Sequence, residues 1–226
     1  MSLRPLRAAF FDMDGLIIDT ERLDFRAWQE TLAAHGYELR MEHWLGVVGT
    51  WGAFEAMYDA VGVPQADRQR LRDAKRERYM AMVRANLHPL PGFSTLHGLF
   101  RARGVTTAVV STASRDWVDL ILGEMGIADD FDLTLSGDDV ENGKPAPDLY
   151  LLACNRAGED PGSCVVFEDS AHGVRAGIDA GIATVAVPNG ITQAQAFDHA
   201  SARVPSLEEV DATLLVGLGL ALPAEV

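Results

Sequence analysis

The sequence predicts an α/β protein whose parallel sheet is interrupted by an all-helical insert. After the Pro- and Gly-rich segment 89–92, apolar strand patterns alternate with helical patterns. Strands that alternate with helices of about 10 to 15 residues are typical of βαβ units, and therefore of a parallel sheet. Between residues 20 and 87 the pattern is helical, with almost no strand-like run. We therefore expect a core of residues 1–18 and 90–226 and an insert of residues 19–89.

The spacing of apolar residues predicts the individual elements of the core. The segment RAAFF at 7–11 is expected to be a short buried strand that joins the sheet formed by the later strands. After the insert we expect helices at 93–103, 116–125, 147–157 and 173–180. Between these helices we expect strands at 105–110, 131–135, 165–167 and 184–187.

The composition is that of a globular protein and excludes several classes of function. The chain has 226 residues, of which 48% are hydrophobic and 23% charged, and its formal net charge is −14. Such an acidic chain lacks the basic face that nucleic-acid binding needs. No apolar run reaches the roughly 18 residues of a membrane span. Cys154 and Cys164 are too few for a disulfide framework or a metal cluster and are expected to be buried in a reducing compartment. We expect a cytoplasmic monomer without nucleic-acid or membrane partners.

The segment FFDMDGLIID at residues 10–19 places two carboxylates, Asp12 and Asp14, at the end of an apolar strand. A carboxylate that is buried without a partner costs several kcal/mol. Asp and Gly are also the usual residues of solvated turns, so this motif alone leaves two interpretations open. Either the aspartates are turn residues, or a cation lies between them.

Polar residues also follow three later strands of the predicted sheet. In a parallel sheet, ligands bind outside the carboxyl ends of the strands. Ser111 and Thr112 follow one of these strands at the start of a helix, where backbone N–H groups and the helix dipole favour an anion. Lys144 lies in the loop after the next strand and supplies a cation for that anion. We expect Ser111, Thr112 or both to bind a phosphate group.

Four carboxylates gather at the same edge of the sheet, because Glu168 and Asp169 follow a further strand and join Asp12 and Asp14. Ionised carboxylates held together need a cation, and oxygen ligands without clustered His or Cys favour Mg²⁺. These carboxylates are therefore the candidates for holding Mg²⁺. A metal, an anion site and a carboxylate nucleophile together predict phosphoryl transfer, so the turn interpretation becomes the weaker one.

Four short motifs, in this order, resemble those of the haloacid dehalogenase superfamily. They are DMDGLIID at 12–19, Ser111, KPAPD at 144–148 and FEDS at 167–170. The helical insert between the first two motifs resembles the β-phosphoglucomutase-like phosphatase branch of that superfamily. The resemblance covers nearly the whole chain. It implies a Rossmann-like core with a four-helix-type cap, which corresponds to residues 19–89 here.

The resemblance also implies a role for each matching residue. Asp12 is the nucleophile that forms an aspartyl-phosphate, and Asp14 is the general acid and base. Ser111 binds the phosphate, and Lys144 bridges the phosphate and the nucleophile. The implied ligands of Mg²⁺ are Asp12, the backbone carbonyl of Asp14, Glu168 and Asp169. Dehalogenases of the superfamily lack an acid at the position of Asp14, which favours phosphoryl chemistry over carbon–halogen hydrolysis.

Two residues of the helical insert are candidate substrate contacts. Glu21 opens the insert near the rim of the core, where it meets a substrate hydroxyl or is a solvated residue of the first helical turn. Lys75 lies at i, i+4 spacing between Leu71 and Tyr79, and it matches a lysine that reaches the substrate phosphate in the mutases. The arginine-rich run at 68–78 is otherwise expected to be a solvated helix face.

The sequence departs from the mutases of the superfamily at two places. Asp24 stands where the mutases have a histidine that couples cap closure to acid–base chemistry. The segment GTWG at 49–52 lacks the arginine expected there for a second phosphate. We therefore predict a Mg²⁺-dependent phosphatase that acts on a small phosphorylated metabolite, a sugar or polyol phosphate. The alternatives are a β-phosphoglucomutase-like phosphosugar mutase and a non-catalytic binding or regulatory protein on the same fold.

Overall fold

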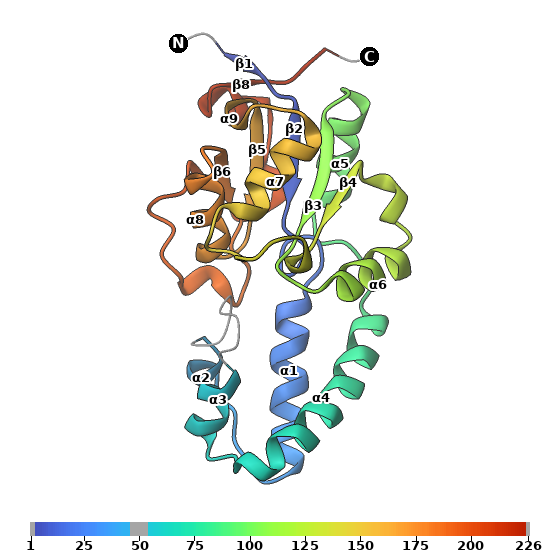
Figure 1. The fold of residues 1–226 in the computed structure, drawn as a ribbon, viewed down its shortest axis with the longest axis vertical. Helices are drawn as coiled ribbons and strands as arrows, with labels where there is room; N and C mark the ends of the chain where they lie inside the picture. The colour runs from blue at the N-terminus through green and yellow to red at the C-terminus, as the bar shows by residue number, and fades with distance from the viewer. Residues whose placement is uncertain (1–2, 46–53, 225–226) are drawn as a thin grey trace.

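Within residues 3–45 and 54–224, which the computed structural model describes, six parallel strands form the main sheet (Figure 1). Their order is β4-β3-β2-β5-β6-β7, so the strand that precedes the insert, β2, lies inside the sheet. The strands are β2 (Ala8–Phe11), β3 (Thr106–Val110), β4 (Leu133–Leu135), β5 (Cys164–Glu168), β6 (Ala183–Ala186) and β7 (Ala202–Arg203). This architecture confirms the predicted α/β fold.

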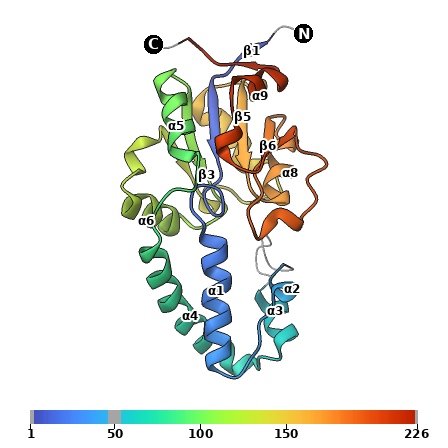
Figure 2. The same ribbon diagram turned by 180° about the vertical axis from the view of Figure 1, so that it is seen from behind.

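Helices cover both faces of the sheet. Successive side chains of a strand point to opposite faces, and accordingly Ala9 and Phe11 of β2 pack into one apolar cluster while Ala8 and Phe10 pack into another. The first cluster includes residues of α5 (Phe93–Ala102), α6 (Arg115–Met125) and α9 (Ala212–Gly217). The second includes residues of α7 (Asp148–Ala157) and α8 (Ala171–Asp179). Figure 1 shows α7 in front of the sheet, and Figure 2 shows α5 and α9 in front when the molecule is seen from behind.

The helices between β2 and α5 stand beyond the carboxyl ends of the strands (Figure 1). They are α1 (Thr20–Ala34), α2 (Met41–Leu45), α3 (Phe54–Val61) and α4 (Gln65–Ala85). The insert has an apolar cluster of its own, to which Trp28, Leu32 and Leu71 belong. The two connections between insert and sheet lie side by side, since the backbone N–H of Leu90 donates to the C=O of Ile17 at 2.7 Å.

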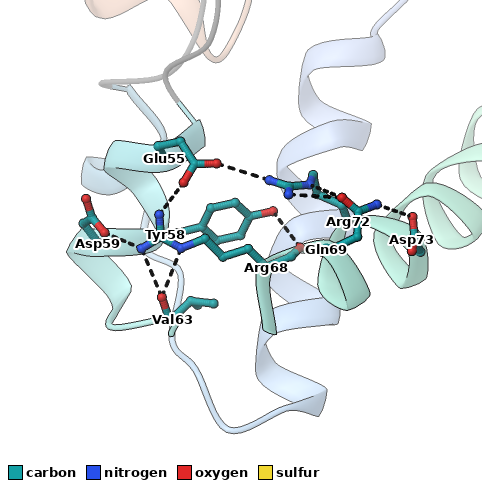
Figure 3. A network of polar contacts seen from close by, with 8 residues as sticks. All are labelled: Glu55, Tyr58, Asp59, Val63, Arg68, Gln69, Arg72 and Asp73. Carbon is teal, nitrogen blue, oxygen red and sulfur yellow. Dashed lines mark hydrogen bonds and ion pairs between the residues drawn. The ribbon is translucent and has the colours of Figure 1, made fainter. Parts of the chain in front are cut away.

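A buried arginine joins α4 to α3 within the insert (Figure 3). The side chain of Arg68 is 9% exposed and forms ion pairs with Glu55 and Asp59 of α3. It also donates to the backbone C=O of Val63 at 3.3 and 3.2 Å and lies over the ring of Tyr58. The expectation of a solvated helix face is therefore wrong for Arg68, because its charge is used to fix one helix on another.

The structure differs from the predicted elements mainly at their ends. α8 begins at Ala171 rather than at residue 173, because the hydroxyl of Ser170 accepts a hydrogen bond from the N–H of Gly173 and caps the helix. A parallel pair outside the main sheet, β1 (Arg4–Pro5) with β8 (Leu220–Ala221), is not predicted by the sequence pattern. Short 3₁₀ turns occur at Ala128–Asp130, Gly137–Asp139, Pro161–Ser163, Thr192–Ala194 and Leu207–Glu209. Among the described helices, none combines the length and apolarity that crossing a membrane requires.

Candidate active site

Asp12 lies at the carboxyl end of β2 and is held by a buried lysine. Its residue exposure is 7%, and the Lys144 ammonium donates to Asp12 Oδ1 at 2.6 Å. The same ammonium donates to Glu168 Oε1 at 2.5 Å and to the backbone C=O of Val110 at 2.8 Å. Lys144 therefore ties together the ends of three neighbouring strands, β2, β3 and β5. The loop that carries it is brought to this edge as the sequence predicts.

Asp14 follows two residues later, in a turn that only glycine completes. Gly15 has a φ of +91°, and a Cβ there would lie 2.4 Å from Asp169 Oδ2. The turn directs the carboxylate of Asp14 toward hydroxyl and indole donors. Thr20 Oγ1 donates to Asp14 Oδ1 at 2.7 Å and Trp117 Nε1 donates to the same oxygen at 3.0 Å. The two aspartates thus have different partners despite their proximity in the chain.

Three carboxylates converge at one point beside Lys144. Oxygen atoms of Asp12, Glu168 and Asp169 lie within 4.8 Å of one another. Glu168 is completely buried at the end of β5, and α8 approaches it so closely that a Cβ at Gly173 would lie 1.8 Å from Glu168 Oε1. Only a glycine at position 173 leaves room for this approach.

Burial and neighbouring charges shift the pKa values of Asp12, Asp169 and Lys144. Burial, with the charges of Glu168 and Asp14, raises the pKa of Asp12 to about 8 against the opposing effect of Lys144. Burial raises the pKa of Asp169 well above its usual value, and repulsion from Asp12 and Glu168 adds to this. Burial lowers the pKa of Lys144, but the adjacent carboxylates outweigh it and raise that pKa above the usual value. One lysine therefore does not neutralise three buried carboxylates when all of them are ionised.

This site fits a bound divalent cation. Buried carboxylates are stable as anions only when they are paired or coordinate a metal, and the donor atoms are oxygens of the kind that Mg²⁺ binds. Asp12, Glu168 and Asp169 form the cluster that would hold the cation. The carboxylate of Asp14 does not belong to this cluster and is engaged by Thr20 and Trp117 instead.

The two predicted phosphate contacts behave differently. Ser111 is 2% exposed, and its hydroxyl donates to Asp14 Oδ2 at 3.3 Å while it accepts from the N–H of Ala113 at 3.0 Å. Thr112 directs its methyl group toward Gly143, where an added Cβ would lie 3.4 Å from Thr112 Cγ2. Ser111 is therefore the hydroxyl that contacts Asp14.

The candidate residues of the insert also lie near the site. Burial raises the pKa of Glu21 to about 8, and the charges of Asp24, Asp14 and Asp12 contribute to the shift. Lys75 forms an ion pair with Asp24, and both side chains are mostly buried, at 13% and 18% exposure. Its ammonium is therefore already paired. The segment 49–52, where the sequence lacks an expected arginine, lies outside the described residues.

Sequence reasoning missed several residues that orient the carboxylates. Tyr150 of α7 donates to Glu168 Oε1 at 2.8 Å, and Asn189 Nδ2 donates to Asp169 Oδ2 at 2.7 Å. Thr20 and Trp117, the donors to Asp14, carry no motif either. Their roles depend on contacts between distant segments, so the sequence alone contains no signal that singles them out.

A family model described as haloacid dehalogenase-like hydrolase matches residues 6–181 of the chain. The chain belongs to this family. The match includes every element that brings a carboxylate or the lysine to the site, from β2 to α8. The family match confirms the resemblance to the haloacid dehalogenase superfamily that the four motifs indicate.

Relatives of this hydrolase include phosphatases that it matches over most of their length. It is 33% identical to "Putative phosphatase YhcW" of Bacillus subtilis, over 93% of this chain and 96% of that protein. It is 32% identical to fructose-1-phosphate phosphatase YqaB of Escherichia coli, over 78% of this chain and 94% of that protein. The crystal structure titled "putative beta-phosphoglucomutase" from Thermotoga maritima superposes with a TM-score of 0.76 at 26% identity, covering 90% of this chain and 95% of that one. These findings identify the chain as a phosphoric monoester hydrolase, a phosphatase acting on a phosphorylated metabolite, which sets aside the non-catalytic alternative.

Proposed function

We propose that this protein is a Mg²⁺-dependent phosphatase of a sugar or polyol phosphate, and that it acts through a phosphorylated intermediate on Asp12. The observation that carries the proposal is the different environment of the two aspartates. Asp12 lies against Lys144 and the carboxylate cluster, whereas Asp14 is surrounded by the hydroxyl and indole donors Thr20, Ser111 and Trp117. Two carboxylates in contrasting surroundings are suited to different parts in one reaction.

In the first step, a carboxylate oxygen of Asp12 attacks phosphorus and forms an acyl phosphate, while the bond from phosphorus to the substrate oxygen breaks. Asp14 supplies the proton that this oxygen needs to leave as an alcohol. Burial raises the pKa of Asp14 even though its three hydrogen bonds oppose the shift, and a raised pKa favours the protonated form that this step needs. Lys144 and the hydroxyl of Ser111 compensate the charge of the transferring phosphoryl group.

In the second step, Asp14 takes a proton from water, whose oxygen attacks phosphorus. The bond between phosphorus and Asp12 breaks, inorganic phosphate leaves, and both aspartates return to their starting state. Mg²⁺ held by Asp12, Glu168 and Asp169 would offset the excess negative charge and keep Asp12 ionised as a nucleophile.

We further propose that residues 19–89 form a cap domain that selects the substrate. Glu21 offers a carboxyl group to a substrate hydroxyl, which suits the polyol part of a sugar phosphate. The pairing of Lys75 with Asp24 leaves that lysine already neutralised, so the insert is poorly equipped to hold a second phosphate. Water is therefore favoured over a bound sugar phosphate as the acceptor, and the phosphatase is favoured over the mutase.

A screen of phosphate release tests this function. The panel contains fructose 1-phosphate, glucose 1-phosphate, glycerol 3-phosphate and sorbitol 6-phosphate, each measured with Mg²⁺, with EDTA and with Zn²⁺. We expect release with Mg²⁺ for at least one of them and a loss of release with EDTA. A protein that works better with Zn²⁺ than with Mg²⁺ contradicts the proposed metal.

A coupled assay distinguishes the phosphatase from the mutase. β-Glucose 1-phosphate is supplied with glucose 1,6-bisphosphate, and both inorganic phosphate and glucose 6-phosphate are followed. We expect inorganic phosphate to form faster. Isomerised sugar phosphate in excess of free phosphate would establish the mutase instead.

A further inference from the structure

Trp117 holds one oxygen of the Asp14 carboxylate. It lies near the start of α6, and its indole N–H donates to Asp14 Oδ1 at 3.0 Å. The hydroxyl of Thr20, the first residue of α1, donates to the same oxygen at 2.7 Å. The other oxygen, Oδ2, faces the hydroxyl of Ser111 at 3.3 Å. Two donors therefore fix Oδ1 and leave Oδ2 on the side of the expected phosphate contact.

Tyr79 of α4 packs against the indole of Trp117 and lies close to Thr20. Its ring stacks on Trp117, with centroids 5.3 Å apart and an angle of 20° between the planes. Burial raises the pKa of Tyr79 well above its usual value, and the charges of Asp24 and Asp14 add to this shift. The ammonium of Lys75 lies 4.1 Å from the centroid of the same ring. The helical insert thus reaches, through Tyr79, the indole that binds Asp14 Oδ1.

We propose that Trp117 is a positioning residue for the acid Asp14, and that the Tyr79–Trp117 stack lets the helical insert hold this acid in its working orientation. The inference rests on the proposed function, in which Asp14 gives a proton to the leaving oxygen. Proton transfer requires the acid oxygen to lie about 2.6–3.2 Å from its acceptor. A carboxyl group that loses the indole donor keeps only the Thr20 hydroxyl on Oδ1. Its rotation about the terminal bond is then less restricted, and Oδ2 points less steadily at the leaving group.

The leaving group of the substrate separates this role from simple packing. An alkyl phosphate needs a proton on its departing oxygen, whereas p-nitrophenyl phosphate releases a stable phenolate without one. Trp117→Phe removes the N–H donor and keeps an aromatic ring, although a smaller one, against Tyr79. We expect it to lower kcat/KM about tenfold for the best sugar phosphate of the panel, in line with the loss of one buried hydrogen bond, and less than about threefold for p-nitrophenyl phosphate.

Two further variants test the stack and the specificity of the effect. The measured quantity is the ratio of kcat/KM for the sugar phosphate to kcat/KM for p-nitrophenyl phosphate. Tyr79→Leu removes the ring against Trp117 and is expected to lower this ratio. Tyr79→Phe keeps the stack and is expected to lower the ratio less. Trp44→Phe is the matched control, because Trp44 lies in the apolar cluster of the insert and its Nε1 has no hydrogen-bond partner among the described residues. It is expected to leave the ratio unchanged.

The hydrogen bond of Trp117 can also be followed without measuring catalysis, by the indole ¹⁵N–¹H NMR signal. The signal of Trp117 is identified by its absence in Trp117→Phe. We expect Asp14→Ala and Tyr79→Leu each to move this signal toward the position of a free indole, and Trp44→Phe to leave it in place. An unmoved signal in Asp14→Ala, or equal losses of kcat/KM on both substrates in Trp117→Phe, overturns this inference alone. Inactivity of the unmutated protein toward every phosphate monoester tested overturns the proposed function, and this inference with it.

Discussion

Two clusters of charged side chains, one at the edge of the sheet and one in the helical insert, use burial in opposite ways. In the insert, the cation is buried and its partners are exposed to solvent. The side chain of Arg68 is 9% exposed, while those of Glu55 and Asp59 are 52% and 71% exposed (Figure 3). At the sheet, the cation and its carboxylate partners are all buried. The side chain of Lys144 is 5% exposed, and those of Asp12 and Glu168 are 10% and 0% exposed.

The comparison indicates which cluster is structural and which is functional. Arg68 has two carboxylates and a backbone carbonyl as partners, so its charge is satisfied within the protein. Lys144 faces Asp12 and Glu168, and Asp169 lies in the same carboxylate cluster without an ion pair to lysine or arginine among residues 3–45 and 54–224. A protein gains nothing in stability from an excess of buried negative charge. Such an excess points to a cation and a phosphoryl group that arrive from solution.

The largest expected effect is on turnover, from the loss of the attacking charge. Asp12→Asn keeps the shape of the side chain and removes its nucleophilic oxygen, so phosphatase activity should fall by about a thousandfold or more. Initial rates of phosphate release with Mg²⁺ measure this. A variant that kept more than a tenth of the unmutated activity would show that another residue is the nucleophile.

A second change separates stability from activity at the sheet cluster. Asp169→Asn removes one of the repelling carboxylates and keeps an oxygen that accepts from Asn189. We expect the apparent affinity for Mg²⁺, measured from activity, to fall about tenfold to a hundredfold. In EDTA we expect Tm to rise by about 3 °C, because the buried repulsion is relieved. A fall of Tm in EDTA would mean that this cluster is balanced without a metal.

The opposite result is expected in the insert. Arg68→Met keeps about the length of the side chain but removes its charge. The backbone C=O of Val63 and the carboxylates of Glu55 and Asp59 then lose this partner, so Tm should fall by about 5 °C. Arg72→Met is the matched control, because Arg72 also pairs with Glu55 but is 39% exposed, and it should change Tm by about 1 °C. Activity at 25 °C should stay within about twofold in both variants, since a folded insert keeps its residues at the site. Equal shifts of Tm would show that the burial of Arg68 contributes nothing.

The smallest expected effect concerns the substrate hydroxyls. Glu21 has a pKa of about 8, raised by burial and by the neighbouring carboxylates Asp24, Asp14 and Asp12, so at neutral pH it is mostly a neutral hydrogen-bonding group. Glu21→Ala should raise KM for the best sugar phosphate about tenfold and leave KM for p-nitrophenyl phosphate unchanged. Glu21→Gln keeps a neutral hydrogen-bonding group and should change KM less. An equal rise of KM for both substrates would remove Glu21 from substrate recognition.

Much of the fold is readable from the sequence because it depends on local patterns. The apolar run Ala8–Phe11 and the alternation of strands and helices after residue 92 predict the sheet, and both are found. The pair β1–β8 is not predictable in this way, since its two-residue strands leave no periodic signal. The ends of helices also shift where a cap decides them, as Ser170 does for α8.

The sequence by itself determined which chemical groups reach the edge of the sheet. Asp12, Asp14, Ser111, Lys144, Glu168 and Asp169 directly follow strands or lie in the loops after them, and parallel strands end at one edge. Only the tertiary structure decided how these groups are oriented. Tyr150, Asn189 and Trp117 hold the carboxylates of Glu168, Asp169 and Asp14 across sequence separations of 18, 20 and 103 residues. The same holds for the pairing of Lys75 with Asp24 and for the burial of Arg68. A hydrogen bond between distant segments depends on the packing of whole helices, and packing leaves no short motif in the chain.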